Sequence, residues 1–397
     1  MAKRGTIGIL TGGGDVPGLN PAIRAITIRA LREDFRVLGI RRGWGGLVDL
    51  VAEPDADNRH NVQELTEETV NRAGRTGGTF LHTSRTRPSH LPRAAVPDHL
   101  RDLYAEDVND ATPSVLKNLE HLGIETLIAI GGDDTLSYAH RLHTEGVNVV
   151  AIPKTMDNDV PGTDYCIGFS TCVTRTIELT HRLRTSAGSH ERFLVIEVFG
   201  RYAGYTALLP AMAGAADRCL IPEHPFDLDQ LTELMVYDRN RNPSRYSVVL
   251  VSEGATIRGG EMRFEGEEAD QFGHRKLGGI GDVVSEELQE RSARFNNGQR
   301  VNVVNQRLGY LVRSGEPDAM DSIVPMAFGN LALDLLLAGK SGRLVSVRNG
   351  AYDNVPIDVI TGRKKVVDVH RHYNVQRLRP IYHTFNRQPV FIMTGDV

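Results

Sequence analysis

The sequence contains few of the residues that mark disulfide-rich, metal-binding or nucleic-acid-binding proteins. It has three cysteines in 397 residues, Cys166, Cys172 and Cys219, and their spacing fits neither a zinc site nor a redox pair. An odd number cannot all pair within one chain, so we expect buried thiols in a reducing compartment. Aromatic residues make up only 6%, with a single tryptophan, and no basic cluster is interleaved with them. This pattern argues against nucleic-acid binding.

Long apolar runs and an excess of one charge are also missing. No stretch approaches the ~20 apolar residues of a membrane span, and the N-terminus lacks the apolar core of a signal peptide. The formal net charge of −4 is close to neutral and gives no indication of a nucleic-acid or membrane surface. We therefore expect a cytoplasmic protein that binds neither nucleic acid nor membrane.

The chain does contain a repeated order of short β-rich runs, glycine-rich turns and helical stretches. Strands are predicted at 6–10, 37–40, 126–130, 149–152, 193–198, 219–221 and 246–252, and helices at 22–31, 202–213, 281–295 and 319–338. Asn20 is expected to cap the first helix, with Pro21 at its first position. This alternation predicts an α/β fold with mainly parallel sheets, and the length predicts two Rossmann-like lobes. Ligands of such folds bind at the carboxyl ends of the strands.

A run of glycines directly follows the first predicted strand. Gly12, Gly13 and Gly14 precede Asp15 and a predicted helix. Glycines there let the backbone approach a phosphate, and the helix N-terminus supplies amide N–H groups. The run is not a P-loop, because no Gly-Lys-Ser/Thr follows. A tight turn without a ligand explains the glycines equally well, so both interpretations stay open at this point.

Two aspartate-rich segments carry the strongest chemical signal. Asp133 and Asp134 follow Gly131-Gly132 at a strand end, where a carboxylate can hold Mg²⁺ that bridges phosphate oxygens. Aspartate is also a good helix cap, although two adjacent aspartates exceed what a cap needs.

The second segment runs from Pro153 to Asp159 and places Lys154 and Thr155 just ahead of Asp157. A carboxylate can act as a general base towards an attacking hydroxyl, and a lysine can offset charge that develops on phosphate oxygens. A polar loop that ends at Pro161-Gly162 does not account for Lys-Thr-x-Asp directly after a buried strand.

Several motifs in a fixed order resemble the phosphofructokinase family over about residues 5 to 350. They are Gly-Gly-Gly-Asp, Gly-Gly-Thr-Phe-Leu with Ser-Arg, Gly-Gly-Asp, Pro-x-Thr-x-Asp-Asn-Asp, Phe-Gly-Arg and Gly-Tyr-x-x-Arg. The resemblance implies the phosphofructokinase fold, phosphorylation of fructose 6-phosphate with Mg²⁺, and a homodimer or homotetramer. It also implies a donor-binding lobe at 1–168, joined again by about 312–350, a sugar-phosphate lobe at 169–311, and a tail at 351–397 that packs on the lobes.

The resemblance also implies a role for each matching residue. Asp157 corresponds to the catalytic base, Asp133 to the magnesium ligand, and Arg85 and Lys154 to cations beside the transferring phosphate. The implied donor-binding residues are Gly13, Asp134, Thr135 and Lys154. The implied sugar-phosphate residues are Thr155, Asp159, Arg192, Phe199, Gly200, Arg201, Glu253, Tyr310 and Arg313. Taken singly, Arg201 and Arg313 are equally consistent with solvated surface charges, and Glu253 with a strand-end carboxylate.

The implied role of Arg192 is to reach the sugar 6-phosphate of a neighbouring subunit. A second cross-subunit arginine of the family falls near Val304, where this chain departs from the pattern. Arg300 or Arg307 replaces this arginine only if the alignment of the chain with the family pattern shifts by a few residues.

Two positions predict pyrophosphate rather than ATP as the donor. Members of the family that use ATP resemble Gly-Gly-Asp-Gly-Ser and Pro-Gly-Thr-x-Asp, and this chain has Asp134 and Lys154 in place of the two glycines. A carboxylate at the first position would repel a nucleotide α-phosphate by about 4 kcal/mol at ~4 Å and an effective dielectric of ~20. Pyrophosphate has no α-phosphate to repel. A plain salt bridge between Asp134 and Lys154 is the alternative.

Three other activities stay open at this stage. They are an ATP-dependent kinase of the same fold, the same chemistry on sedoheptulose 7-phosphate, and a noncatalytic phosphosugar-binding regulator. The presence of both Asp133 and Asp157 argues against the regulator. Residues 254–278 are rich in glycine, glutamate and charge, which predicts a loop or hairpin. Neither the segment 86–112 nor the tail after about 350 has a predicted role.

Overall fold

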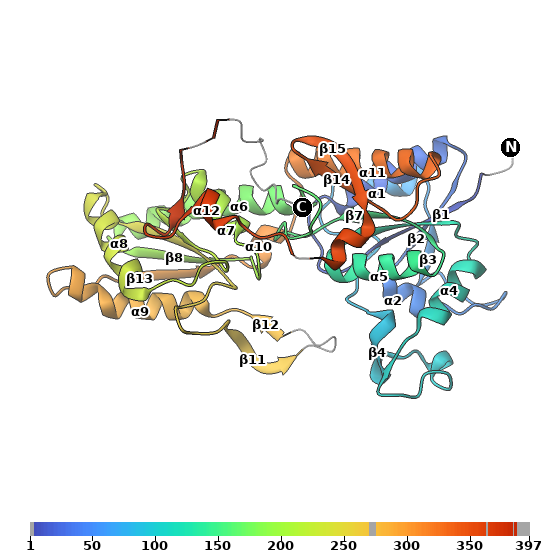
Figure 1. The fold of residues 1–397 in the computed structure, drawn as a ribbon, viewed down its shortest axis with the longest axis horizontal. Coiled ribbons are helices and arrows are strands. Elements are labelled where there is room, and N and C mark those ends of the chain that lie inside the picture. The colour runs from blue at the N-terminus through green and yellow to red at the C-terminus, as the bar shows by residue number, and fades with distance from the viewer. Residues whose placement is uncertain (1–3, 270–274, 363, 384, 387–397) are drawn as a thin grey trace.

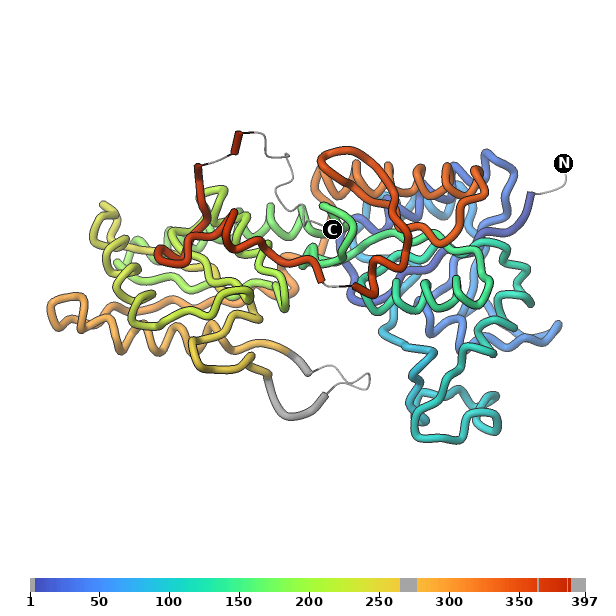
Figure 2. Tube along the Cα trace, viewed as in Figure 1, coloured from blue at the N-terminus to red at the C-terminus, as the bar shows by residue number. Residues whose placement is uncertain are grey.

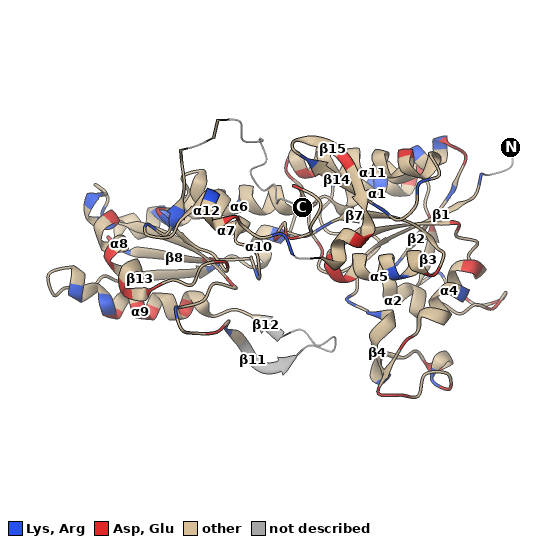
Figure 3. Ribbon diagram, viewed as in Figure 1, with Lys and Arg blue, Asp and Glu red and all other residues tan. Residues whose placement is uncertain are grey.

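The computed structural model describes residues 4–269, 275–362, 364–383 and 385–386. Parts of the predicted hairpin at 254–278 and of the predicted tail at 351–397 therefore lie outside the described residues. Two lobes, each built on a sheet with flanking helices, lie side by side (Figure 1). Lysine, arginine, aspartate and glutamate are interspersed over both lobes (Figure 3).

The first lobe contains a seven-stranded sheet in the order β15-β14-β7-β6-β1-β2-β3. The five inner strands pair in parallel, and the edge strands β3 and β15 pair antiparallel to their neighbours. The strands are β1 (Thr6–Thr11), β2 (Arg36–Ile40), β3 (Val62–Glu64), β6 (Thr126–Gly131), β7 (Asn148–Pro153), β14 (Arg343–Arg348) and β15 (Ala351–Pro356). The tube in Figure 2 shows the late, orange part of the chain returning to this early, blue lobe.

The second lobe contains a four-stranded parallel sheet in the order β13-β8-β10-β9. The strands are β8 (Phe193–Val198), β9 (Arg218–Leu220), β10 (Ser247–Ser252) and β13 (Val303–Arg307). Every residue of β8 and β10 is buried. A continuous buried run is what a parallel strand covered on both faces requires. The predicted α/β class with mainly parallel sheets is confirmed.

Helices cover both faces of the first sheet. They are α1 (Leu19–Arg32), α2 (Trp44–Val48), α3 (Glu67–Ala73), α4 (Thr112–His121), α5 (Asp133–Thr144) and α11 (Met320–Leu337). Alternate residues of β6 point to opposite sides: Ile128 and Ile130 join the core with α1 and α11, and Leu127 and Ala129 join the core with α4 and α5. The second lobe has α6 (Phe169–Ser189), α7 (Tyr205–Met212), α8 (Leu228–Arg241), α9 (Ile280–Phe295), α10 (Tyr310–Arg313) and α12 (Val369–His372).

The start of α1 differs from the prediction. Asn20 does not cap this helix, because α1 begins at Leu19 and its N-cap is Gly18, with φ of 108°. The buried Asn20 side chain donates to Thr76 Oγ1 at 2.9 Å and accepts from the amide of Phe80 at 3.0 Å. Asparagine here holds the loop that leads to Arg85. The hydrogen bonds of Asn20 to this distant loop therefore take the place of the local capping interaction that was predicted.

Helix α11 corrects a second expectation. Within the described ranges it is the one helix that is long and apolar enough to cross a bilayer, by length and composition. The structure packs it against α1 and β7. A Cβ at Gly329 would lie 3.0 Å from the Cβ of Ala25, so this glycine allows the two helices to approach closely. Packing in the protein core accounts for the apolar residues on the buried face of α11, such as Phe328, whereas Ile323 and Met326 are exposed.

The remaining segments are short. The predicted hairpin at 254–278 is present as β11 (Phe264–Ala269) and β12 (Arg275–Leu277). Residues 86–112 form β4 (Leu91–Pro92), β5 (Val108–Asn109) and single turns of 3₁₀-helix. Towards the end of the chain, β16 (Tyr373–Asn374) pairs with β17 (Arg379–Pro380). Tyr373 donates to the carbonyl of Cys219 at 2.7 Å, which fastens this part to the second lobe. All three cysteines are buried and free.

Candidate active site

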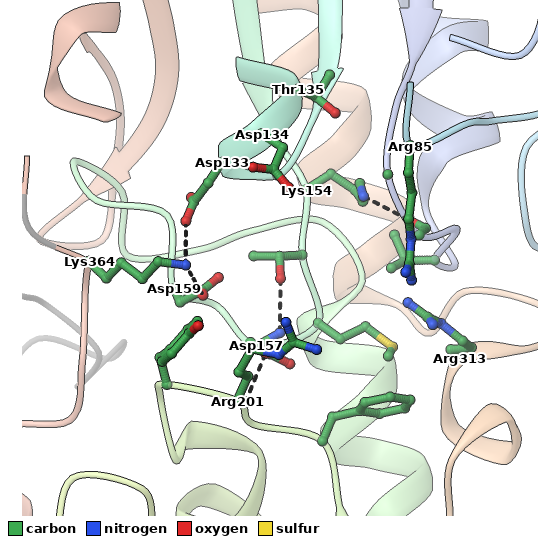
Figure 4. Close-up of a pocket in the computed structure, with 18 of the residues that line it drawn as sticks. Arg85, Asp133, Asp134, Thr135, Lys154, Asp157, Asp159, Arg201, Arg313 and Lys364 are labelled. Carbon is green, nitrogen blue, oxygen red and sulfur yellow. Dashed lines mark hydrogen bonds and ion pairs between the residues drawn. The ribbon is translucent and has the colours of Figure 1, made fainter. Parts of the chain in front are cut away.

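A cavity of about 420 Å³ brings strand ends of both lobes together. The loops after β1, β6 and β7 enter it from the first lobe, and those after β8 and β10 enter it from the second (Figure 4). Thirteen predicted residues line it: Gly13, Arg85, Asp133, Asp134, Thr135, Lys154, Thr155, Asp157, Asp159, Phe199, Arg201, Glu253 and Arg313. The strand-end positions explain why residues so distant in sequence meet.

Three predicted residues do not line this cavity. Gly200 has φ of +121°, and a Cβ on it would lie 2.8 Å from the Ala203 carbonyl oxygen, so it shapes the turn between Phe199 and Arg201. Tyr310 is 75% exposed, and its ring lies 5.8 Å from the guanidinium of Arg313. Its role is therefore indirect within this chain.

Arg192 is the third of these residues. It precedes β8 and thus lies at the opposite end of that strand from Phe199, about 20 Å away at ~3.3 Å per residue. It cannot reach the cavity of its own chain. Of the two substitutes considered for the second arginine, Arg300 and Arg307, Arg307 pairs with Asp282 and lies 3.7 Å from Glu197 Oε1 within this chain.

The glycine turn after β1 forms a cradle between two cations. A Cβ at Gly13 would lie 3.2 Å from Lys154 Nζ, and one at Gly14 would lie 2.5 Å from Arg313 Nη2. Lys154 Nζ donates to the Gly14 carbonyl at 2.7 Å. Glycine at both positions therefore leaves the space beside these cations open. An anionic group is the ligand that this arrangement favours.

The surroundings of Lys154 disfavour its charged form. Its side chain is only 4% exposed. Burial, and then the nearby Arg313, lower the pKa of Lys154 from 10.5 to about 8. The lysine would be better stabilised as a cation once negative charge entered the cavity.

Asp157 has the surroundings of a general base. Its Oδ2 accepts from the amide of Arg201 at 3.2 Å, and its own amide donates to Thr155 Oγ1 at 3.2 Å. Burial raises the pKa of Asp157, while the hydrogen bond from Arg201 opposes the rise. A carboxylate with a raised pKa is a stronger proton acceptor than a free one.

Three further carboxylates crowd around Asp157. Burial raises the pKa of Glu253 to about 8, and the charge of Asp157 adds to the rise. The pKa of Asp159 is raised by burial and by Asp157, and that of Asp133 by burial and by Asp159. Like charges at this density favour an added cation or proton.

Asp134 does not form the alternative salt bridge with Lys154. Its Oδ1 instead lies 2.9 Å from Nη2 of Arg87, and both side chains are partly exposed. The reason is geometric, since Asp134 lies in the first turn of α5 while Lys154 turns towards Gly14. Arg87 neutralises part of the Asp134 charge, so this carboxylate would repel an α-phosphate less strongly than an unpaired one.

Several lining residues had no role in the sequence analysis, and Lys364 is the most informative. Its Nζ lies 2.9 Å from Asp133 Oδ2, 3.9 Å from Asp159 Oδ2 and 4.4 Å from the centre of the Tyr202 ring. The pKa of Lys364 is raised: burial lowers it, but Asp133 and Asp159 outweigh burial. The other lining residues without a predicted role are Val16, Trp44, Ser84, Thr86, Arg87, Gly132, Met156 and Tyr202. No local pattern could have found Lys364, because its carboxylate partners Asp133 and Asp159 are more than 200 positions away.

The acidic side of the cavity fits a divalent cation. In the described part of the chain no group of three or more His, Cys, Asp or Glu has metal-binding geometry. Asp133 Oδ1, however, is buried without a hydrogen-bond partner, and Oδ2 already binds a cationic group, the ammonium of Lys364. Magnesium in phosphotransfer sites takes one or two carboxylates, water and substrate phosphates. Asp133 and Asp159 can supply such a set.

Comparisons with known proteins agree with this geometry. The family model described as Phosphofructokinase matches residues 6–336. A curated relative named pyrophosphate–fructose 6-phosphate 1-phosphotransferase, from Dictyoglomus thermophilum, is 38% identical over 366 residues, which cover 91% of this chain and 95% of the relative. A relative named ATP-dependent 6-phosphofructokinase 3, from Streptomyces coelicolor, is 35% identical over 364 residues and covers 91% and 96%.

Among solved structures, a pyrophosphate-dependent phosphofructokinase from Marinobacter aquaeolei superposes with a TM-score of 0.72 at 17% sequence identity. The match covers 99% of this chain and 92% of that one. At this identity the likeness shows the fold alone.

Proposed function

The chain belongs to the phosphofructokinase family, and on that premise we propose that it transfers a phosphoryl group from pyrophosphate to the 1-hydroxyl of fructose 6-phosphate. The products are fructose 1,6-bisphosphate and phosphate. Both phosphate-ester and pyrophosphate bonds have similar transfer potential, so the reaction is readily reversible. Relatives with both kinds of donor in their names are similar to the chain at 35–38% identity. The donor therefore has to be argued from the site.

The observation that carries the proposal is the place of Asp134 and Lys154. Both line the same cavity as Asp133 and Asp157. In the motifs around these two positions, family members that use ATP carry glycine at both. We propose that Asp134, paired with Arg87, fills the space in which a nucleotide would continue beyond its β-phosphate. Lys154, turned towards the glycine cradle, supplies a cation to a short donor. Pyrophosphate suits both features better than ATP.

The reaction needs no covalent enzyme intermediate. The oxygen of the sugar 1-hydroxyl attacks one phosphorus of pyrophosphate, and the bond from that phosphorus to the bridging oxygen breaks. The hydroxyl proton passes to a carboxylate oxygen of Asp157, and phosphate leaves. Lys154, Arg85 and Arg313 offset the negative charge on the phosphate oxygens. In the reverse direction Asp157 returns the proton as a general acid.

Mg²⁺ is the proposed cofactor. Asp133, together with Asp159 nearby, would hold it, and when bound it would neutralise charge on the donor phosphates. Burial of Asp133 and the unpartnered oxygen on its side chain support this assignment.

The sugar phosphate is proposed to lie against the second lobe, in contact with Phe199, Arg201 and Glu253. Arg192 is too far from the cavity of its own chain to take part there. We therefore propose a cytoplasmic homodimer or homotetramer in which Arg192 from a second copy completes the phosphate site.

A steady-state assay with two donors and two acceptors tests the proposal. Purified protein is given Mg²⁺ with either pyrophosphate or ATP, and with either fructose 6-phosphate or sedoheptulose 7-phosphate. We expect turnover with pyrophosphate and fructose 6-phosphate, and a kcat/KM for ATP at least tenfold lower. Robust turnover with ATP and none with pyrophosphate would falsify the donor assignment. Turnover of sedoheptulose 7-phosphate would widen the acceptor range, and no turnover with any pair would favour the noncatalytic regulator.

A further inference from the structure

Lys364 enters the cavity from the C-terminal part of the chain, which has no assigned role. Its ammonium lies between two carboxylates, 2.9 Å from Asp133 Oδ2 and 3.9 Å from Asp159 Oδ2. Its side chain is 44% exposed, and the face of the Tyr202 ring lies 4.4 Å away. In Figure 4, Lys364 reaches towards Asp133 and Asp159 from the side opposite Arg85 and Arg313. Lys364 therefore occupies one oxygen of the carboxylate that is proposed to hold the metal.

The chain around Lys364 is anchored on both lobes. The next residue, Lys365, is buried and donates from Nζ to the Thr163 carbonyl at 2.7 Å, and from its amide to the Asp159 carbonyl at 3.2 Å. Two residues further on, the amide of Val367 donates to Glu223 Oε1 at 2.7 Å. Asp159 and Thr163 follow β7 of the first lobe, and Glu223 follows β9 of the second. These bonds fix the backbone from which the Lys364 side chain extends.

We propose that Lys364 is a built-in counter-ion that competes with the divalent cation for Asp133. Without metal, the ammonium neutralises the carboxylate. When the cation binds, the ammonium must move away from Asp133, because two positive charges on one carboxylate repel each other strongly. The proposal rests on the proposed function only in taking that cation to be the Mg²⁺ of the transfer reaction.

The displaced side chain has room to move. Lys364 lines the active-site cavity and also a neighbouring cavity of about 1060 Å³. A lysine stem has four rotatable bonds, so the ammonium can move away from Asp133 while the anchored backbone stays in place. A buried, fixed cation could not yield in this way.

The experiment measures binding of Mn²⁺, a spectroscopic substitute for Mg²⁺, to the full chain without pyrophosphate or sugar phosphate. Free Mn²⁺ is followed by electron paramagnetic resonance. Lys364→Gln removes the charge and keeps most of the length, and we expect it to bind Mn²⁺ about fivefold more tightly than the original protein. Lys364→Arg keeps the charge and should bind within twofold of the original. Lys340→Gln makes the same charge change at an exposed lysine outside the cavity and should leave binding unchanged.

Unchanged or weaker Mn²⁺ binding by Lys364→Gln would overturn the proposal, since a lysine that only orders the C-terminal segment would not oppose the metal. Lys364→Ala, which offers no new ligand, must reproduce the gain; a gain confined to the glutamine variant would mean that the new amide binds the metal and would also overturn it. Thermal melting confirms that each variant is folded. Because no donor is present, a failed pyrophosphate assay and a failed metal competition are separate results.

Discussion

The two walls of the cavity carry opposite charges, and like charges lie close together within each wall. The cationic wall consists of Arg85, Lys154 and Arg313, and the acidic wall consists of Asp133, Asp157, Asp159 and Glu253. On one wall, burial and Arg313 lower the pKa of Lys154 to about 8. On the other, burial and Asp157 raise the pKa of Glu253 to about 8. The cationic wall thus lacks its natural counter-ion, a phosphate anion, while the acidic wall has only the ammonium of Lys364 in place of a metal ion. Together the two walls fit a ligand that carries a phosphate anion and a metal ion, such as the proposed metal-bound diphosphate.

The largest effect is expected from removing the proposed general base of the acidic wall, Asp157. Asp157→Asn keeps the shape of the side chain but cannot accept the hydroxyl proton. We expect kcat to fall about 10³-fold, with binding of fructose 6-phosphate largely retained, because Phe199, Arg201 and Glu253 are untouched. Stopped-time product assays and calorimetric titration of the sugar phosphate measure the two quantities.

The matched control for this variant is Asp55→Asn, which makes the same change at an exposed carboxyl outside the cavity. It should leave kcat within twofold of the original. If Asp157→Asn also retained its turnover, Asp157 would have no part in proton transfer, and another carboxylate of the acidic wall would have to be the base.

The next largest effect tests the donor side. The double change Asp134→Gly with Lys154→Gly restores the glycines of the ATP-dependent pattern. We expect the ratio of kcat/KM for ATP to that for pyrophosphate to rise about thirtyfold. The full repulsion of about 4 kcal/mol would give more, but Arg87 neutralises part of the Asp134 charge. Parallel assays with both donors give the ratio.

Arg87→Gln serves as the control for this change, because it removes the partner of Asp134 and leaves both donor positions intact. It should lower ATP use further. A double variant whose donor ratio did not rise would show that the steric and charge argument for pyrophosphate is wrong, even though the family assignment stands.

Most of the fold and the first-lobe side of the site followed from local sequence. Short apolar runs predicted the central strands within a few residues, and ligand chemistry at strand ends predicted that Asp133, Lys154 and Asp157 would meet. These predictions succeeded because a parallel strand buried on both faces reads as a continuous apolar run, and its carboxyl end has a fixed direction. Asp134 was placed correctly at the cavity, but its partner was not foreseen.

What sequence could not supply were contacts set by tertiary packing. Asn20 has the local signature of a cap, yet it binds a loop near Thr76, about 56 positions along the chain. Lys364 follows a 3₁₀ turn in a stretch with no strand-end signal, and its position depends on the bonds of the next residues to both lobes. The proposed role of Arg192 would depend on a second copy, which no property of one chain displays. Each of these contacts joins segments whose proximity exists only after folding.

A smaller effect, the pH dependence of kcat/KM, tests the charge of Lys154 in the cationic wall. Lys154, with its pKa lowered to about 8, loses its proton in the free protein as pH rises above 8. We expect kcat/KM for pyrophosphate to fall up to about tenfold per pH unit above that point. Arginine stays charged over this range, so Lys154→Arg should lack this alkaline fall, although its kcat is lower. Pyrophosphate ionises identically in both assays. If the fall persisted in the arginine variant, Glu253, whose pKa is also about 8, would be its source.

The smallest effect is on stability, and it tests whether the cationic wall is held under stress. A pKa lowered from 10.5 to about 8 corresponds to about 3 kcal/mol against the charged form. Lys154→Met removes this cost, but it also removes the hydrogen bond to the Gly14 carbonyl, so we expect a net gain of about 1 kcal/mol at pH 7.

The sign of the pH dependence follows from the direction of the shift. Because the folded pKa is the lower one, the cost is fully present below pH 8 and disappears as pH rises towards 10.5. Thermal melting of the ligand-free protein at pH 7 should therefore show the methionine variant higher by roughly 1–2 °C. The difference should close near pH ~9 and reverse by about pH 10, because the lost hydrogen bond to the Gly14 carbonyl is then no longer offset. Lys340→Met, at an exposed lysine, should show no such difference at either pH. A methionine variant that melted lower at pH 7 would mean that Lys154 stabilises the empty cavity. The cationic wall would then not be destabilised by the absence of its ligand.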